Sequence, residues 1–304
     1  MNRILWIGDR IEVTAIRRGS LEPAVLGHVD LEDLRTVVVR TASAHGPNGP
    51  QGPMTQFILG EAVRHLSAQL GADVQPRGGR EPVPRVLSVL VGHERFVEDV
   101  LGVSINQMRR RWPSASDWYA DLLAYILRPS RHDVNYARLR EDLPGWLELP
   151  LGEFARHLAG AQISQALDVS LYGLADTVRW LWPRHPVVRA SLAASLGALH
   201  ELWIPILYQM FGVYGLQHRE GIDPEEMAWT LNALMSWESH QWSIDQQLVR
   251  YVDPSDGRRR SRTSRAGMVY LLGACESVDG EPLTLSALYA RRPRRPFSGE
   301  PMGR

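Results

Sequence analysis

The chain has 304 residues, of which 44% are apolar and 22% charged, and its 34 basic side chains, all arginine, balance 34 acidic ones. This neutral total excludes a protein that coats nucleic acid through its overall charge, but it leaves room for a local basic patch. The composition is that of a folded globular chain, and the length fits two ordinary domains.

Strand signals come first along the chain. Alternation of apolar and polar residues predicts strands over 3–8 and 10–17, and the β-branched run 36–39 predicts a third. The glycine- and proline-rich segment 45–53 fits neither a helix nor a strand. We therefore interpret residues 1–52 as a β-containing extension followed by a linker.

Helical periodicity begins at residue 55. Gly71 ends a first helix, whose predicted apolar face consists of Ile58, Ala62, Leu66 and Leu70. Short helices are predicted between residues 86 and 127. Longer helices are predicted over 146–168, 171–182 and 187–215, the last with a kink at Pro205.

The last third of the chain contains one strong helix start and a mixed tail. Asp223 fits an N-cap, Pro224 the first helical position and Glu226 a capping box. In the tail, residues 251–304, we expect a polar loop, then a hairpin over 268–286 that turns at Asp279–Gly280, and a disordered, solvated end over 291–304.

The most informative segment is 94–112, which predicts two short helices joined by a glycine turn. Gly102 supplies the left-handed conformation that ends the first helix, and Ser104 caps the second, which runs about two turns to Pro113. Val103 and Met108 are expected to point inwards. Ser114, with Asp117 three residues later, caps the next helix. This arrangement is a helix-turn-helix.

The second of these helices carries the side chains that duplex DNA requires. Amides pair with the edge of adenine, and guanidinium groups pair with guanine or with phosphates. The candidate DNA-binding residues are Ser104, Asn106, Gln107, Arg109, Arg110 and Arg111.

Two segments resemble the tetracycline-repressor (TetR) family. Gly102-Val103-Ser104, followed after five residues by Arg110 to Ser114, is similar to that family's recognition helix and the start of its next helix. The segment from Gly221 to Ala228 is similar to the acidic, proline-initiated helix near the end of its ligand domain. The order and spacing of the two segments extend the resemblance over residues 54–245.

The resemblance implies a mainly α fold with two domains and small β-containing additions at both ends. Residues 53–128 would form the helix-turn-helix domain, and residues 129–250 a helical ligand-binding and dimerisation domain. The expected protein is a cytoplasmic transcriptional repressor that binds a palindromic operator in double-stranded DNA as a homodimer. A small apolar ligand would release it, in a cavity lined by Trp203, Tyr208, Met210, Phe211 and Tyr214.

Two alternatives stay open. Glu98, Arg109 and Ala115 depart from the family's pattern, which is compatible with a helical binding or scaffold protein of the same fold without DNA recognition. Alternatively, the runs 3–8, 36–40 and 86–91 are parallel strands of a Rossmann-like layer in an α/β enzyme.

The sequence lacks the spacings typical of catalytic and metal sites. Cys275 is its only cysteine, and His200–Glu201 lacks the second histidine of a zinc-protease helix. No apolar stretch approaches the roughly 20 residues that a membrane helix requires. We therefore expect no catalytic site, no metal, no cofactor and no membrane partner.

Overall fold

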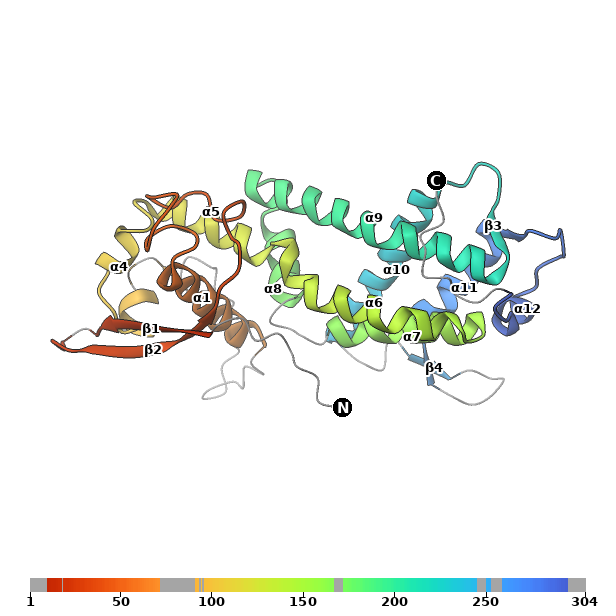
Figure 1. Ribbon diagram of the computed structural model, residues 1–304, viewed down its shortest axis with the longest axis horizontal. Helices are drawn as coiled ribbons and strands as arrows, with labels where there is room; N and C mark the ends of the chain where they lie inside the picture. Colours follow the sequence, from red (N-terminus) through yellow and green to blue (C-terminus); the bar gives the residue numbers. More distant parts are fainter. Residues whose placement is uncertain are drawn as a thin grey trace, which may run out of the picture. The chain divides into compact units, whose positions relative to one another are not determined.

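The computed structural model describes residues 10–17, 19–71, 91–92, 94, 96–166, 172–244, 250–252 and 259–294, and the structural statements below concern these residues. They are mainly helical, as predicted, and form three two-stranded antiparallel sheets. The chain divides into two compact units (Figure 1). Unit 1 contains residues 1–128 and 169–192, and unit 2 contains residues 129–168 and 193–304.

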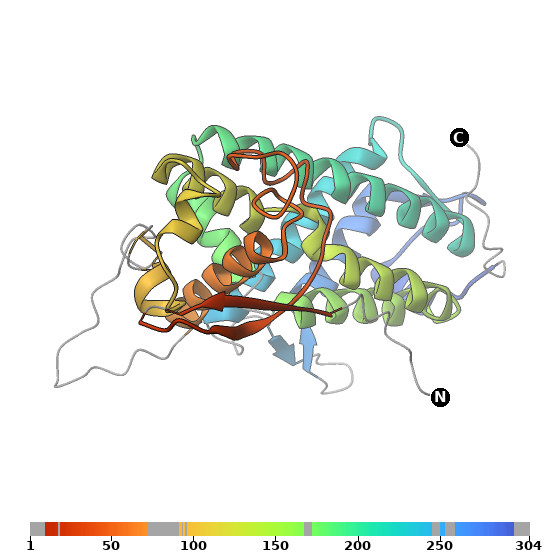
Figure 2. The ribbon, with the colours of Figure 1, turned by 60° about the vertical axis from the view of Figure 1, so that its left-hand side comes forward.

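Unit 1 begins with a β-hairpin of strands β1 (Arg10–Ile16) and β2 (Pro23–Asp30). Its inner face, with Val13 and Ala15 buried, packs on helix α1 (Pro53–Gly71) (Figure 2). The predicted face of α1 is confirmed for Ile58, Ala62 and Leu66, which are all buried. Strand β2 had no clear signal in the sequence, because only part of its outer face is polar.

The strand predicted at 36–39 is wrong. The backbone N–H groups of Val37 and Val38 donate to the carbonyl of Leu34, at 3.0 and 2.8 Å, and so form a turn. Leu34 and Val38 are buried by this turn, so the apolar run contributes to the core without forming a strand. The Rossmann-like layer therefore lacks its second strand. The predicted strand 3–8 and residues 86–90 lie outside the described residues.

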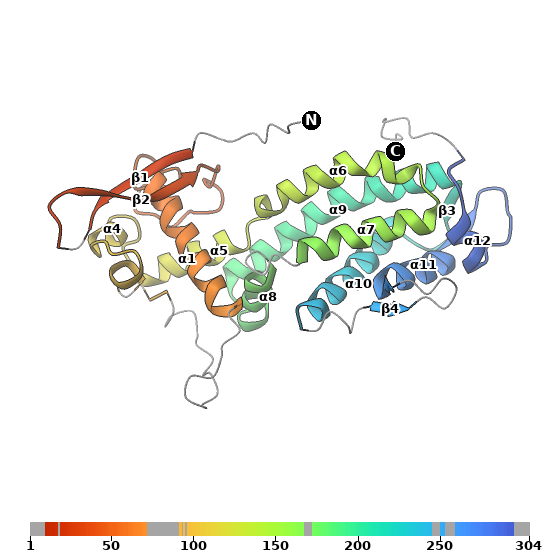
Figure 3. The ribbon, with the colours of Figure 1, turned by 90° about the horizontal axis from the view of Figure 1, so that it is seen from below.

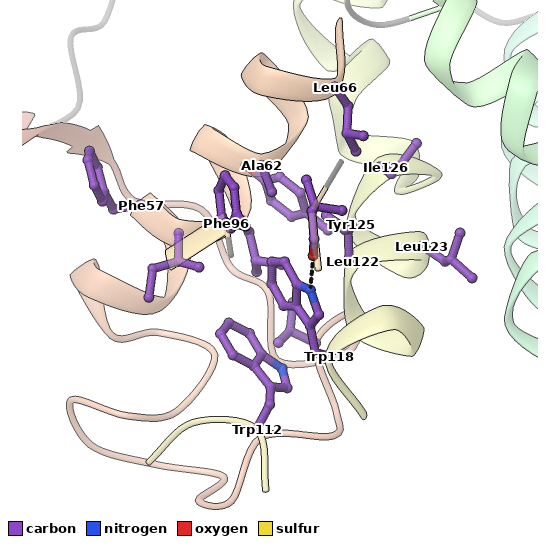
Figure 4. Packing of buried hydrophobic residues seen from close by; sticks show 14 of the residues in the cluster. Phe57, Ala62, Leu66, Phe96, Trp112, Trp118, Leu122, Leu123, Tyr125 and Ile126 are labelled. Atoms are coloured by element: carbon purple, nitrogen blue, oxygen red, sulfur yellow. Dashed lines mark hydrogen bonds between the residues drawn. The ribbon is translucent and has the colours of Figure 1, made fainter. Parts of the chain in front are cut away.

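Besides the start of α9 (Pro186–Tyr214) up to Leu192, the remaining described elements of unit 1 are four helices. These are the single π-helical turn η2 (Phe96–Val100), α4 (Asn106–Arg109), α5 (Ala115–Ile126) and α8 (Tyr172–Leu181). Helices α1, α5 and α8 contact one another. The largest fully buried side chains between them include Trp112, Trp118 and Phe96 (Figure 4).

Unit 2 is a group of helices in which α7 (Leu151–Ala166) contacts α6, α10, α11 and α12 (Figure 3). Its other elements are η3 (Pro129–His132), α6 (Asp133–Leu147), β3 (Leu216–His218), α10 (Pro224–Ile244), β4 (Arg250–Val252), β5 (Arg259–Ser261), α11 (Arg262–Ala274), β6 (Cys275–Ser277) and α12 (Leu285–Ala290). Helix α9 (Pro186–Tyr214) contains Pro205, and its residues from Ala193 onwards belong to unit 2.

One local prediction for unit 2 is confirmed. The Asp223 carboxylate accepts a hydrogen bond from the Glu225 N–H at 2.8 Å, so Asp223 caps α10. Gly280 has a φ of 72° and its N–H donates to the Ser277 carbonyl at 3.0 Å, so the chain turns there, although not within the predicted hairpin.

The hairpin predicted over 268–286 is wrong. Residues 262–274 form α11, and β6 pairs with the distant strand β3, from His218 opposite Cys275 to Leu216 opposite Ser277. The prediction of a disordered, solvated end over 291–304 is also wrong at Arg291. The Arg291 guanidinium donates to the carbonyls of Tyr214 and Gly215 at 2.5 and 2.8 Å, and so closes the end of α9. Residues 295–304 lie outside the described residues.

Candidate nucleic-acid interface

The predicted glycine turn is present at residue 102. Gly102 has a φ of 67°, the left-handed conformation that follows the end of η2. Next to it, the N–H of Val103 donates to the Val97 carbonyl at 3.1 Å, and the Val103 side chain is fully buried. Val103 also forms an isolated antiparallel bridge with Arg17 at the end of β1. The turn is thus held from two sides.

Helix α4 is shorter than the sequence predicts. It spans four residues. Hydrogen bonds between residues three apart tighten both of its ends. At the start, the Gln107 N–H donates to the Ser104 carbonyl at 2.9 Å, and at the end the Arg111 N–H donates to the Met108 carbonyl at 2.8 Å. The predicted Ser104 cap is wrong, because Ile105 takes the N-cap position of α4 and makes no side-chain capping hydrogen bond. The Ser104 hydroxyl instead accepts from the Asn106 N–H at 3.3 Å. Met108 is fully buried, as predicted, and anchors the turn.

Four of the six candidate DNA-binding residues are exposed, namely Ser104, Asn106, Arg109 and Arg110. Arg109 forms an ion pair with Glu94 at 3.0 Å, in which the two side chains are 57% and 68% exposed. Such an exposed pair contributes about 0–1 kcal/mol. Arg109 can therefore exchange Glu94 for a phosphate at little cost.

Arg111 is the main correction to the predicted site, because it is only 3% exposed. Its guanidinium donates to four neutral oxygens: Gln107 O at 2.7 Å, Gln107 Oε1 at 2.9 Å, Thr55 Oγ1 at 3.1 Å and Pro47 O at 3.4 Å. Burial, followed by the nearby Arg110 charge, lowers the pKa of Arg111 to about 10. Arg111 is thus a structural clamp that holds α4 to α1 and to the loop before α1. Gln107 is half-buried, and its side-chain oxygen already accepts a hydrogen bond from Arg111.

Beneath α4, two tryptophans fix the position of the turn. The rings of Trp112 and Trp118 meet edge to face at 4.8 Å (Figure 4). Trp118 Nε1 donates to the Val91 carbonyl at 3.2 Å, and Trp112 Nε1 donates to Asp121 Oδ2 at 2.9 Å. Paired N–H groups let both indoles be buried without an unsatisfied donor.

Asp121 was missed by sequence reasoning, although it is an acidic residue on the apolar face of α5. Its carboxylate is 1% exposed and accepts from the backbone N–H groups of Val39 and Arg40, each at 3.0 Å, as well as from Trp112. Burial raises the pKa of Asp121, and the hydrogen bonds from these donors oppose that rise. The Ser114 cap of α5, by contrast, is confirmed: its hydroxyl accepts from the Asp117 N–H at 3.1 Å.

Unit 2 contains an apolar cavity of about 60 Å³ between α7, α9, α10 and α11. Of the five predicted ligand-binding residues, Trp203 and Met210 line it. The other three do not: Tyr208 is exposed, Phe211 is buried elsewhere in the core, and the Tyr214 hydroxyl donates to the Leu149 carbonyl at 2.8 Å. The Trp203 indole N–H is buried and has no hydrogen-bond partner among the described residues.

The described residues give few signs of other chemistry. They contain no group of three or more His, Cys, Asp or Glu side chains that could hold a metal ion. Burial raises the pKa of the Cys275 thiol to about 12, which makes it a poor nucleophile. None of the described helices has both the length and the apolar character needed to cross a bilayer.

Comparison of the chain with protein families, curated proteins and solved structures gives no match.

Proposed function

We propose that this chain is a DNA-binding transcriptional regulator that contacts duplex DNA with the segment 104–110. One observation carries the proposal. Around a left-handed glycine, the apolar residues Val103 and Met108 are fully buried, while Ser104, Asn106, Arg109 and Arg110 are exposed. A fixed turn with projecting amide and guanidinium groups is what a duplex surface requires.

The four exposed side chains have different expected roles. Asn106 offers a donor and an acceptor for a base edge, while Arg109 and Arg110 supply positive charge to phosphates. Because α4 is only one turn long, the proposed contact is shallow and depends strongly on charge. Each phosphate that a protein neutralises contributes about 0.9 to the slope of log K against log salt.

The test is equilibrium binding of the full chain to a pool of duplexes of about three helical turns with a randomised centre, over a range of salt concentrations. We expect salt-sensitive binding that Arg109→Gln and Arg110→Gln each weaken. Arg64→Gln is the matched control, because Arg64 is an exposed arginine of α1 that is paired with a carboxylate, Glu61, like Arg109 with Glu94. Equal binding by all three variants would contradict the proposal and would favour a helical scaffold protein.

The proposed effector is a small apolar molecule in the unit 2 cavity. A site of about 60 Å³ is smaller than the roughly 150 Å³ cavity that holds benzene, so binding requires neighbouring side chains to move. The unpaired Trp203 N–H would favour a ligand with one hydrogen-bond acceptor. Phenol is a suitable probe, and it should raise the melting temperature of the wild type more than that of Trp203→Phe.

The proposed assembly is a homodimer through α10. Two of its tryptophans, Trp229 and Trp237, lie eight residues apart and are 57% and 63% exposed, which is unusual for such large apolar side chains. A two-fold contact of this helix with its copy would bury all four rings. Sedimentation analysis should show a dimer for the wild type and a monomer for the double variant Trp229→Gln, Trp237→Gln. A wild-type monomer at micromolar concentration would contradict this assembly.

A further inference from the structure

The β1–β2 hairpin ends beside the proposed interface. Arg17, directly after β1, bridges to Val103, the residue before Ser104. The carbonyl of Arg17 also accepts from the Ser20 N–H at 3.1 Å, which starts the turn at the hairpin tip. Figures 1 and 3 both show the tip of this hairpin at the same end of unit 1 as α4.

The base of the hairpin is fixed to α1, so the tip has a defined place. The Glu32 N–H donates to Gln56 Oε1 at 2.9 Å, and Gln56 Nε2 donates back to the Glu32 carbonyl at 2.8 Å. Along β2, a Cβ added at Gly27 would lie 2.8 Å from Cε2 of Phe57, so the strand packs closely on the helix. The hairpin is thus held on α1 at its base and on Val103 near its tip, next to the segment that contains α4.

The side chains at the hairpin tip are exposed to solvent and do not pack into the core of unit 1. Arg17 is exposed, and Leu21 is 96% exposed at the end of the turn. The exposed acidic residues of the strands, Glu12 and Asp30, lie towards the base, where Asp30 pairs in register with Arg10. Glu22 is the acidic residue of the turn itself.

We infer that the hairpin tip is a second nucleic-acid contact, with the Arg17 guanidinium on a backbone phosphate next to the groove that α4 faces. A two-stranded ribbon fits a DNA groove, and an exposed arginine fixed in position is a typical phosphate contact. The inference rests on the proposed function. It adds Arg17 and residues 19–22 to the interface, outside the segment that resembles the TetR family.

The experiment uses the full chain and the same randomised duplex pool. Arg17→Gln should reduce the slope of log K against log salt by about 0.9, the value for one lost phosphate contact. Glu22→Gln should strengthen binding, because it removes a negative charge from the contact. Arg10→Gln, at the other end of the same strand and also exposed, is the control and should leave the slope unchanged.

The outcomes separate the two proposals. If the wild type binds, Arg110→Gln weakens binding and Arg17→Gln behaves like Arg10→Gln, the inference about the hairpin is overturned while the proposed function stands. If the tip instead binds another protein through Leu21, the DNA slope will again be insensitive to Arg17, and the inference is overturned in the same way. If the wild type shows no salt-dependent binding, both proposals fail. Circular dichroism of each variant checks that the fold is retained.

Discussion

Replacing Arg111 by methionine tests whether this arginine is a structural clamp or a DNA-binding side chain. Methionine keeps much of the apolar stem but provides no hydrogen-bond donor. The oxygens of Thr55 and Gln107 then lose a charged donor that lies 2.7 to 3.1 Å away. Arg110→Met is a closely matched control, because it makes the same chemical change one residue earlier on an exposed side chain.

The size of the effect follows from burial. A buried polar group left without its partner costs about 1–3 kcal/mol. Thr55 is fully buried and bears this cost, whereas half-buried Gln107 can turn its amide towards water. Relief of the buried guanidinium charge offsets part of the loss. We therefore expect Arg111→Met to reduce the free energy of unfolding of unit 1 by about 2 kcal/mol, and Arg110→Met to change it by less than about 0.5 kcal/mol.

Urea denaturation followed by tryptophan fluorescence is the appropriate assay, because the buried Trp112 and Trp118 report on this region. DNA binding, measured under conditions where both variants are folded, should show the reverse order, with the larger loss for Arg110→Met. Equal denaturation midpoints for the two variants would refute the clamp. A larger loss of DNA binding for folded Arg111→Met would return Arg111 to the interface.

Three other substitutions test separate parts of the structure. Asp121→Asn should destabilise unit 1 by about 1–3 kcal/mol, because the single oxygen of an amide cannot accept from both Trp112 Nε1 and the backbone N–H groups of residues 39 and 40. An unchanged midpoint of urea denaturation would argue against this network. Gly267→Ala should stabilise α11 by up to about 1 kcal/mol, because alanine has the higher helix propensity. The same substitution should weaken phenol binding, because the new methyl would lie 3.5 Å from Leu231 and narrow the cavity. A lower melting temperature of the variant would contradict this packing. Arg291→Ala should destabilise unit 2 by about 2 kcal/mol relative to the exposed control Arg292→Ala, since the Tyr214 carbonyl loses its charged donor and the Gly215 carbonyl keeps only the Val278 N–H. Equal stability of the two variants would contradict the proposed cap.

The sequence alone determined the features whose causes lie within a few residues. The apolar face of α1, the left-handed Gly102 and the caps at Ser114 and Asp223 all depend on helical periodicity, on φ or on a hydrogen bond to a near neighbour. The inward positions of Val103 and Met108 follow from the same local pattern. Such signals can be recognised without knowing what packs against them.

Tertiary structure alone decided the features whose partners are distant in the chain. Arg111 resembles its exposed neighbours in sequence, but Thr55, 56 residues earlier, supplies an oxygen that helps to hold it inside. In the same way, β6 pairs with β3 rather than with its own neighbourhood, and Arg291 finds its acceptors at the end of α9. A polar side chain can be buried only where partners replace its water, and those partners are brought together by the fold.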